Sequence, residues 1–234
     1  MMFLVTVPCP KLIYTKYWAR WEDWVWEFEK ETGHRVRIKP ENTPNRLDLS
    51  LSRCVDMAKK LRPAWWVRLD ADIMPEVPLS EMFRMAMLLW DEYGAITGSP
   101  TVDYNGVCQF DRLGHQSLDP VCDGRPFECE WVGGSLVFTP QDVFDRLKPV
   151  SSYVYGRDKV VQNMYVAVQR PNTTEDYDYC ERVRSYGFRV FAAPGNLVRQ
   201  MRPEEYVGMP SYRKGMTKGK TETVWLEKPV GLDA

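Results

Sequence analysis

Histidine and paired cysteines are scarce in this chain. It has only two histidines, His34 and His115, and none of its six cysteines forms a C-x-x-C pair. Zinc ribbons and zinc fingers take their ligands from such groups, so the sequence excludes both. Scattered cysteines are typical of reduced thiols, which predicts a cytoplasmic location. The alternative is a single disulfide among Cys108, Cys122 and Cys129, because the three cysteines lie in one loop-rich stretch.

The chain also lacks long uncharged runs and an excess of charge of one sign. Its longest run without a charged residue, 131–141, has 11 residues, whereas a membrane-spanning helix needs about 20. Lys and Arg total 31 and Asp and Glu total 32, which gives a net charge of −1. Nucleic-acid-binding domains are usually strongly basic, so we expect neither a nucleic-acid partner nor a transmembrane segment. The apolar start, 1–8, has no basic residue before it, which favours a core strand over a signal peptide.

The pattern that is present is that of a folded α/β chain. The 234 residues and 44% hydrophobic content are typical of one globular domain. Strand and helix patterns alternate through the first half, which predicts a parallel sheet flanked by helices. The expected strands there are 3–7, 35–39, 64–69 and 95–97, and the expected helices are 17–28, 47–61 and 82–93. The aromatic stripe of the first helix indicates core packing, and Gly33 ends that helix.

The second half has weaker patterns. Residues 99–130 are rich in Gly, Asp, Pro and Cys and indicate surface loops. The expected elements beyond them are a strand at 136–138, a helix at 140–147 capped by Thr139, a helix from Thr174 or Thr173 to Ser185, and a strand at 188–192. The segment 159–169 fits either a strand or a helix. From residue 201 the composition indicates a tail rather than a core element.

Asp70 and Asp72 follow directly after the apolar strand at 64–69. In open α/β sheets ligands bind outside the carboxyl ends of the strands, so this acid pair is expected at a ligand site. Two carboxylates separated by one small residue suit a divalent ion, Mn²⁺ or Mg²⁺, and a ribose hydroxyl. The structural alternative is that both acids only cap the next helix.

Glu175 and Asp176 form a second acid pair, at the start of the helix that begins after Thr174. A helix N-terminus stabilises a carboxylate as the anion, which suits a general base that must be ionised at neutral pH. The alternative is the ordinary acidic first turn found in many helices.

Four segments, taken in order, resemble inverting GT-A glycosyltransferases of the family-2 type. The segment 174–190 resembles their ED helix, and 131–138 resembles their Gly-containing acceptor-site strand. The segment 66–72 resembles their DxD strand, and Arg53 and Ala58 resemble residues of the arginine-bearing helix before it. The segment 5–8 resembles their first strand with its proline. The resemblance covers residues 3 to about 200. It implies a GT-A type, Rossmann-like α/β fold, with a mixed, mostly parallel sheet flanked by helices on both faces in a single domain.

The resemblance also implies how the domain is divided. Residues 1–200 would form the GT-A domain, with a nucleotide-sugar-binding half at 1–98 and an acceptor-binding half at 99–200. Beyond the resemblance, the composition of residues 201–234 indicates a basic C-terminal tail. Arg213 and Lys214 open its Gly-spaced cationic segment, which would fold over the diphosphate as a lid. The alternatives for the tail are a solvated segment or a weak contact with anionic lipid.

An activity and its residues follow from the same resemblance. The chain would be a metal-dependent glycosyltransferase that moves a sugar from a UDP- or GDP-sugar to the hydroxyl of a glycan, protein or lipid-linked acceptor, with inversion. Asp176 would be the general base, and Glu175 would orient the acceptor or Asp176. Asp72 would bind Mn²⁺ or Mg²⁺, and Asp70 would contact the ribose beside the metal. The other expected substrate-binding residues are Pro8, Lys11, Glu41, Asn42, Arg53, Trp131, Gly133 and Gly134, and Trp131 has a core role as its alternative.

Three other classes of protein remain as alternatives. The late histidine that often binds the metal in GT-A enzymes is missing, and Gln200 or water would take its place. A non-catalytic protein that binds nucleotide or sugar is therefore an alternative. A phosphatase of the haloacid dehalogenase type also uses D-x-D, although normally on its first strand. A sugar nucleotidyltransferase would need a Gly-rich loop after the first strand, where this chain has 8–11 as Pro-Cys-Pro-Lys.

Overall fold

The computed structural model describes most of the chain. The described residues are 1–8, 15–41, 47–75, 77–99, 101–102, 108–111, 125–133, 135–155, 160–166, 174–194, 198–200, 212–217 and 220–225.

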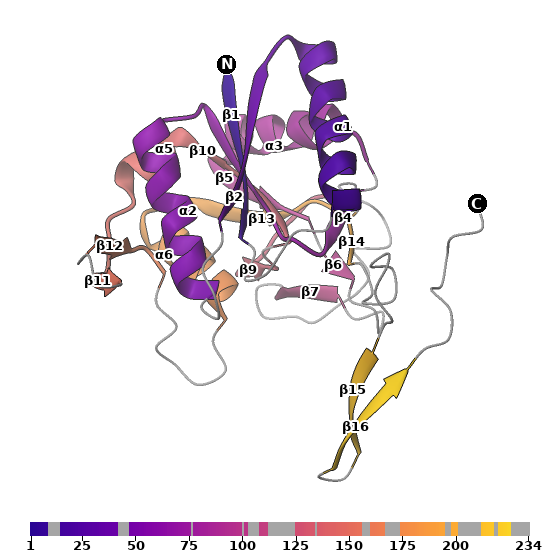
Figure 1. The fold of residues 1–234 in the computed structure, drawn as a ribbon. Helices are drawn as coiled ribbons and strands as arrows, with labels where there is room; N and C mark the ends of the chain where they lie inside the picture. The colour runs from indigo at the N-terminus through magenta and orange to yellow at the C-terminus, as the bar shows by residue number, and fades with distance from the viewer. Residues whose placement is uncertain are drawn as a thin grey trace.

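A seven-stranded sheet forms the centre of the molecule (Figure 1). In spatial order its strands are β2 (Arg35–Glu41), β1 (Met2–Pro8), β3 (Trp65–Leu69), β10 (Leu136–Pro140), β5 (Ala95–Gly98), β13 (Arg189–Ala192) and β8 (Phe127–Glu128). Strands β10 and β8 run antiparallel to their neighbours, and the other five run in one direction. The expected mixed, mostly parallel sheet is confirmed.

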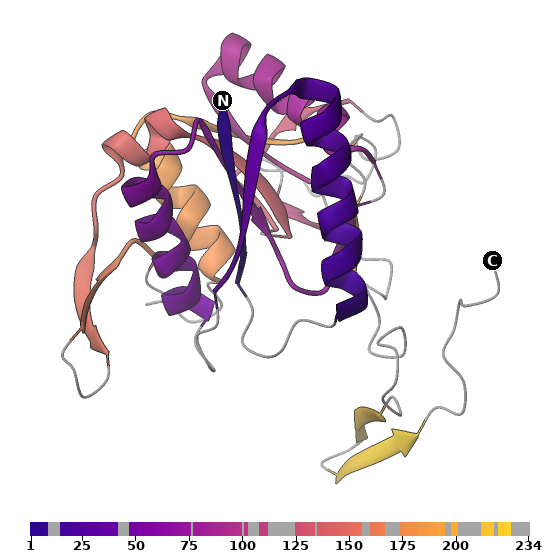
Figure 2. The same cartoon turned by 45° about the horizontal axis from the view of Figure 1, so that its top comes forward.

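Helices cover both faces of this sheet, as Figures 1 and 2 show. Helices α1 (Thr15–Thr32) and α3 (Leu79–Tyr93) pack on one face, and α2 (Leu47–Leu61), α5 (Gln141–Arg146) and α6 (Glu175–Ser185) pack on the other. The side chains of a strand alternate between faces, so Trp65 and Val67 of β3 lie in the α1–α3 cluster while Trp66 lies in the α2–α5–α6 cluster. Apolar clusters therefore pack against both faces of the sheet.

The aromatic stripe of α1 is core, as expected. Trp21 and Phe28 are fully buried. The indole nitrogen of Trp21 donates to the carbonyl of Ile73 over 3.2 Å, and that of Trp24 donates to the carbonyl of Val77 over 3.0 Å. Gly33 follows the helix with a φ of 67°, a conformation that favours glycine.

A second, smaller sheet takes two of its five strands from the region expected to form loops. Its strands are β4 (Ile73–Pro75), β14 (Val198–Gln200), β6 (Thr101–Val102), β7 (Cys108–Asp111) and β9 (Trp131–Val132). The expectation of loops throughout 99–130 is wrong, because β6, β7 and β8 lie there; strands of two to four residues are too short to show an alternating pattern. The two sheets meet at Gly98, where an added Cβ would lie 2.3 Å from a methyl carbon of Val132.

The remaining differences from the sequence-based expectations are local. Thr139 does not cap α5: it lies in β10, its hydroxyl is 3.0 Å from the hydroxyl of Tyr179, and Pro140 takes the cap position. Thr174 does cap α6, since its hydroxyl accepts from the Tyr177 amide over 3.3 Å. The ambiguous segment contains a strand, β12 (Val160–Met164), paired with β11 (Ser151–Tyr155).

The C-terminal region was expected to be a tail rather than a core element. Its described residues pair as an antiparallel hairpin of β15 (Tyr212–Thr217) and β16 (Lys220–Trp225). Among the described residues, no helix combines the length and apolar character that crossing a bilayer requires.

Candidate active site

The Asp70–Asp72 turn lies at the carboxyl end of β3, where it connects the main sheet to β4 of the small sheet. The Asp70 amide donates to the carbonyl of Ser135 over 2.9 Å, and the Ile73 amide donates back to the carbonyl of Asp70 over 3.2 Å. The backbone of the turn is therefore fixed both internally and against the segment that leads into β10. The acid pair lies at the sheet edge that the sequence predicted.

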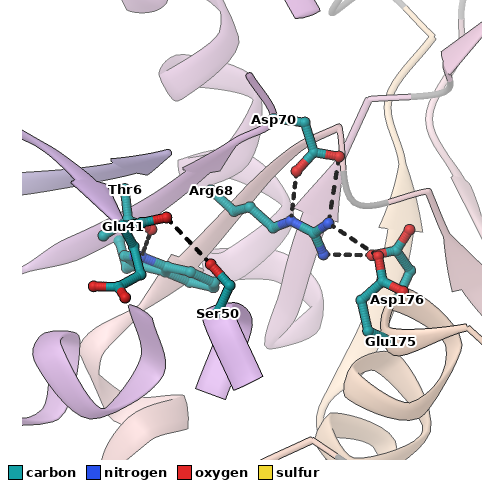
Figure 3. Close-up of polar contacts among 8 residues, drawn as sticks. Thr6, Glu41, Ser50, Arg68, Asp70, Glu175 and Asp176 are labelled. Carbon is teal, nitrogen blue, oxygen red and sulfur yellow. Dashed lines mark hydrogen bonds and ion pairs between the residues drawn. The ribbon is translucent and has the colours of Figure 1, made fainter. Parts of the chain in front are cut away.

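Arg68 is the centre of a cluster of acids at this edge (Figure 3). Its side chain is only 4% exposed. Its Nε donates to Asp70 Oδ1 over 2.9 Å, and its Nη2 is 3.3 Å from Asp70 Oδ2, so the pair is bidentate. Its Nη1 donates to Asp176 Oδ1, and its Nη2 lies 3.6 Å from Glu175 Oε1. We call these four residues the Arg68 cluster.

Residues that are about a hundred positions apart in the sequence thus meet at one place. Asp70 comes from the end of β3, and Glu175 and Asp176 form the first turn of α6. Thr174 caps that turn, and the free amide groups of the helix N-terminus favour negative charge there. Asp70, Glu175 and Asp176 converge on Arg68, while the place of Asp72 beside them and the roles given to these residues stay predictions.

Burial makes the electrostatics of the cluster unusual. Burial lowers the pKa of Arg68, but the carboxylates of Asp176, Asp70 and Glu175 outweigh it and hold that pKa well above its usual value. Burial raises the pKa of Asp70 to about 7, against the lowering effect of Arg68. Burial and the neighbouring Asp176 also raise the pKa of Glu175. Among the described residues three carboxylates lie within ion-pair distance of the one guanidinium of Arg68, an arrangement that favours a further positive charge or a retained proton.

The donor set suits a divalent ion that arrives with a diphosphate. Mg²⁺ and Mn²⁺ prefer oxygen ligands, and Mg²⁺ is commonly held by one or two carboxylates plus substrate phosphates. The turn offers two such groups, Asp72 and Asp70, and both oxygens of Asp70 interact with Arg68. Gln200 pairs in register with Ile73, which brings its backbone next to the turn. Among the described residues no group of three or more His, Cys, Asp or Glu side chains is placed to hold a metal ion by itself.

A second arginine–carboxylate pair lies along the same sheet edge. Glu41 ends β2, where it is paired in register with Pro8 of β1. Its carboxylate Oε1 lies 2.8 Å from Nη1 of Arg53 on α2, and its carbonyl accepts from the Ser50 hydroxyl over 3.3 Å. The structure thus joins two of the expected donor-binding residues, Glu41 and Arg53, and places Pro8 beside them (Figure 3 labels Glu41 and Ser50).

The other expected site residues divide into two groups. Trp131 is half-buried and packs against the core cluster of α2, α5 and α6, and Gly133 is buried. This packing supports the core alternative for Trp131. Lys11, Asn42 and Gly134 lie outside the described residues, and for Arg213 and Lys214 the structure describes the backbone of β15 only.

Sequence reasoning missed Arg68, although the sequence carried a signal for it. Arg68 is the one charged residue in the apolar run of β3, and it precedes Asp70 by two positions. Residues two apart in a strand point to the same face, so an arginine and an aspartate at that spacing are placed to pair. The partnership with Asp176 had no such local signal.

Comparison with known proteins gave results for structure only. No family model matches the chain, and no curated protein matches it significantly. Many solved structures are similar to it at high probability. One is A197 from STIV, with a TM-score of 0.49 and 10% identity, covering 86% of this chain and 95% of that one.

Two other similar structures have glycosyltransferase names. GalNAc-T7 with UDP, GalNAc and Mn²⁺ has a TM-score of 0.48 and 12% identity, covering 90% of this chain and 46% of that one. A Drosophila β1,4-galactosyltransferase 7 mutant, in complex with manganese, UDP-Gal and xylobiose, has a TM-score of 0.46 and 10% identity, covering 96% and 93%. Scores below 0.5 at such low identity do not establish a family or an activity for this chain.

Proposed function

We propose that this chain is a metal-dependent glycosyltransferase of the GT-A type, which moves a sugar from a nucleotide-sugar donor to an acceptor hydroxyl with inversion at the anomeric carbon. The observation that carries the proposal is the Arg68 cluster. Asp70, from the acid pair proposed for the donor, meets Glu175 and Asp176, the pair proposed for the base, at the carboxyl ends of the parallel strands.

The proposed division of work follows from this geometry. Asp70 and Asp72 at the end of β3 hold the donor, with Asp70 toward the ribose and Asp72 toward the diphosphate. A divalent ion bound there with the diphosphate would neutralise the charge that develops on the leaving group. Glu41 and Arg53, further along the same edge, bind the nucleotide base end of the donor.

Asp176 takes the proton of the acceptor hydroxyl as that oxygen attacks the anomeric carbon. Its Oδ1 accepts from Arg68, and a carboxylate has further lone pairs with which to accept the hydroxyl proton. Glu175, next to it on the first turn of α6, orients the acceptor. A displacement with the base on one side of the sugar and the leaving diphosphate on the other gives inversion.

The same observation argues against a phosphatase of the haloacid dehalogenase type. In such a mechanism the first carboxylate of the D-x-D turn attacks phosphorus. Asp70 interacts with Arg68 through both oxygens, which opposes nucleophilic attack. Asp70 also follows the third strand of the chain rather than the first.

A binding experiment tests the donor half of the proposal. The midpoint of thermal unfolding is measured with UDP, GDP, ADP and CMP, each with and without Mn²⁺. We expect one nucleoside diphosphate to raise the midpoint, and to require the ion to do so. Asp72→Ala should abolish that shift, while Asp142→Ala, an exposed acid of α5, should retain it. Absence of any ion-dependent shift would contradict the donor site.

A kinetic experiment tests the base. Release of nucleoside diphosphate is measured over a panel of nucleotide sugars, with water or simple glycosides as acceptors. Asp176→Asn should lower the turnover rate about 10²- to 10⁴-fold while retaining the thermal shift by nucleotide. Asp142→Asn is the matched control, since Asp142 also lies in the first turn of a helix but is exposed. Full turnover in Asp176→Asn would remove the assigned base, and NMR of the anomeric product tests inversion.

A further inference from the structure

We propose that Arg68 is a positioning residue that acts through Asp176: its guanidinium holds the base at a fixed distance from the Asp70 turn. The inference rests on the proposed function and adds to it the group that connects the donor side of the site to the base.

One rigid group makes all the connections. The Nε and Nη2 atoms of Arg68 engage the two oxygens of Asp70, and Nη1 engages Asp176. The guanidinium is planar, so the direction of the bond to Asp176 is fixed once the pair with Asp70 has formed. Nη2 also lies 3.6 Å from Glu175 Oε1, which brings both acids of the first turn of α6 to the same fork.

Arg68 is itself held by the main sheet. It lies in β3, between β1 and β10, where Thr6 and Val137 are its register partners on either side. With 4% of its side chain exposed, it has little room to adopt another rotamer. The ion pair with Asp176 therefore fixes the N-terminus of α6 to the centre of the sheet rather than to a surface group.

Charge alone does not provide this connection. A lysine at this position would keep the positive charge, but its ammonium is a point charge with rotating donors and lacks the planar fork. A small misplacement of a catalytic group is costly, since about 1 Å lowers rates by about 10²-fold in well-ordered sites. Arg68→Lys thus separates the geometric role of Arg68 from its electrostatic one.

A double-mutant cycle on the turnover rate tests the inference. The four proteins are the wild type, Arg68→Lys, Asp176→Asn and the double variant, each assayed with the donor that the wild type turns over. We expect Arg68→Lys to lower the turnover rate at least about tenfold in the wild-type background and by less than about threefold when Asp176 is already Asn, because a residue that acts through another has nothing left to act on.

Arg189→Lys is the matched control. Arg189 lies in β13 of the same sheet but at its exposed side, where it pairs with Glu128, and we expect the turnover rate of this variant to equal that of the wild type. Circular dichroism and thermal unfolding at the assay temperature establish that each variant is folded. A purely structural role of Arg68 would lower the unfolding midpoint and leave the turnover rate of the folded fraction unchanged.

The outcomes separate this inference from the proposed function. Equal effects of Arg68→Lys in both backgrounds, or full turnover in Arg68→Lys, would overturn the inference and leave the glycosyltransferase proposal standing. A wild type that turns over no nucleotide sugar in the panel would overturn both.

Discussion

Arg68 and Arg189 lie in the same sheet and each forms a bidentate pair with a carboxylate, yet their surroundings differ. Arg189 is 40% exposed, pairs with Glu128, and stacks on the rings of Tyr93 and Phe191. Arg68 is 4% exposed and engages three carboxylates. Arg189 pairs with a single carboxylate, and its hydrogen bond lowers the pKa of Glu128, as expected for an ion pair at the surface.

The difference between the two arginines separates a candidate site from a structural pair. Three carboxylates lie within ion-pair distance of Arg68, and burial raises the pKa values of Asp70 and Glu175 although an arginine lies beside them. Carboxyl groups with raised pKa values at the carboxyl ends of parallel strands are typical of a functional site.

The largest expected effect is on folding stability. Arg68→Met leaves three partly buried carboxylates without their buried counter-charge, so we expect it to lower the free energy of unfolding by about 3 kcal/mol. Arg189→Met removes an exposed pair and keeps an apolar side chain against Tyr93, so it should cost at most about 1 kcal/mol. Urea unfolding measures the free energy of unfolding of both variants, and equal decreases would show that the two arginines contribute equally to stability.

A smaller effect concerns the pH dependence of stability. Because the pKa of Asp70 in the folded chain is about 7, above that of an unfolded aspartate, the folded state retains this proton while the unfolded state loses it. The contribution of Asp70 to stability therefore falls as pH rises from about 4 to about 7. Asp70→Asn should be neutral at the acidic end of this window and stabilising at pH 8, by on the order of 1–2 kcal/mol, or roughly 2–8 °C in the unfolding midpoint.

The smallest expected effect is on the contribution of Glu128 to stability, which depends on pH in the opposite direction to that of Asp70. The hydrogen bond from Arg189 lowers the pKa of Glu128, so its contribution is present at neutral pH and is lost as pH falls through the folded-state pKa. Glu128→Gln should therefore cost about 0.2–1 kcal/mol at pH 7, less at high salt, and nothing at strongly acidic pH. If the Glu128 and Asp70 variants responded to pH in the same direction, the contrast between exposed and buried pairs would be wrong.

How much could be predicted from the sequence depended on the length of the elements. Helix α2 was predicted with its observed limits, 47–61, and the aromatic spacing of α1 indicated its buried face, because both persist over several turns. The strands β6, β8 and β9 have two residues each, and their pairing depends on contacts with distant segments. The cap expected from Thr139 failed for the same reason, since its hydroxyl contacts Tyr179, 40 positions away.

The candidate site shows the same limit. Asp70, Asp72, Glu175 and Asp176 were identified because each pair stands at the end of an element that the sequence shows clearly. That Arg68 connects the two pairs could not be predicted, because the contact depends on how α6 packs against β3. Local patterns predicted the acidic residues, and they did not predict the contact between the two segments that carry them.

The turn that carries Asp70 and Asp72 connects the two sheets, since β3 of the main sheet ends at Leu69 and β4 of the small sheet begins at Ile73. The small sheet is seated against the main one at Gly98, where there is no space for even one more carbon beside Val132. A methyl group added at Gly98 would press on Val132 of β9, which lies at the opposite edge of the small sheet from β4. The approach of the two sheets thus depends on a contact between glycine and valine that carries no charge, and measuring ion binding as well as stability in Gly98→Ala would show whether the acid turn depends on it.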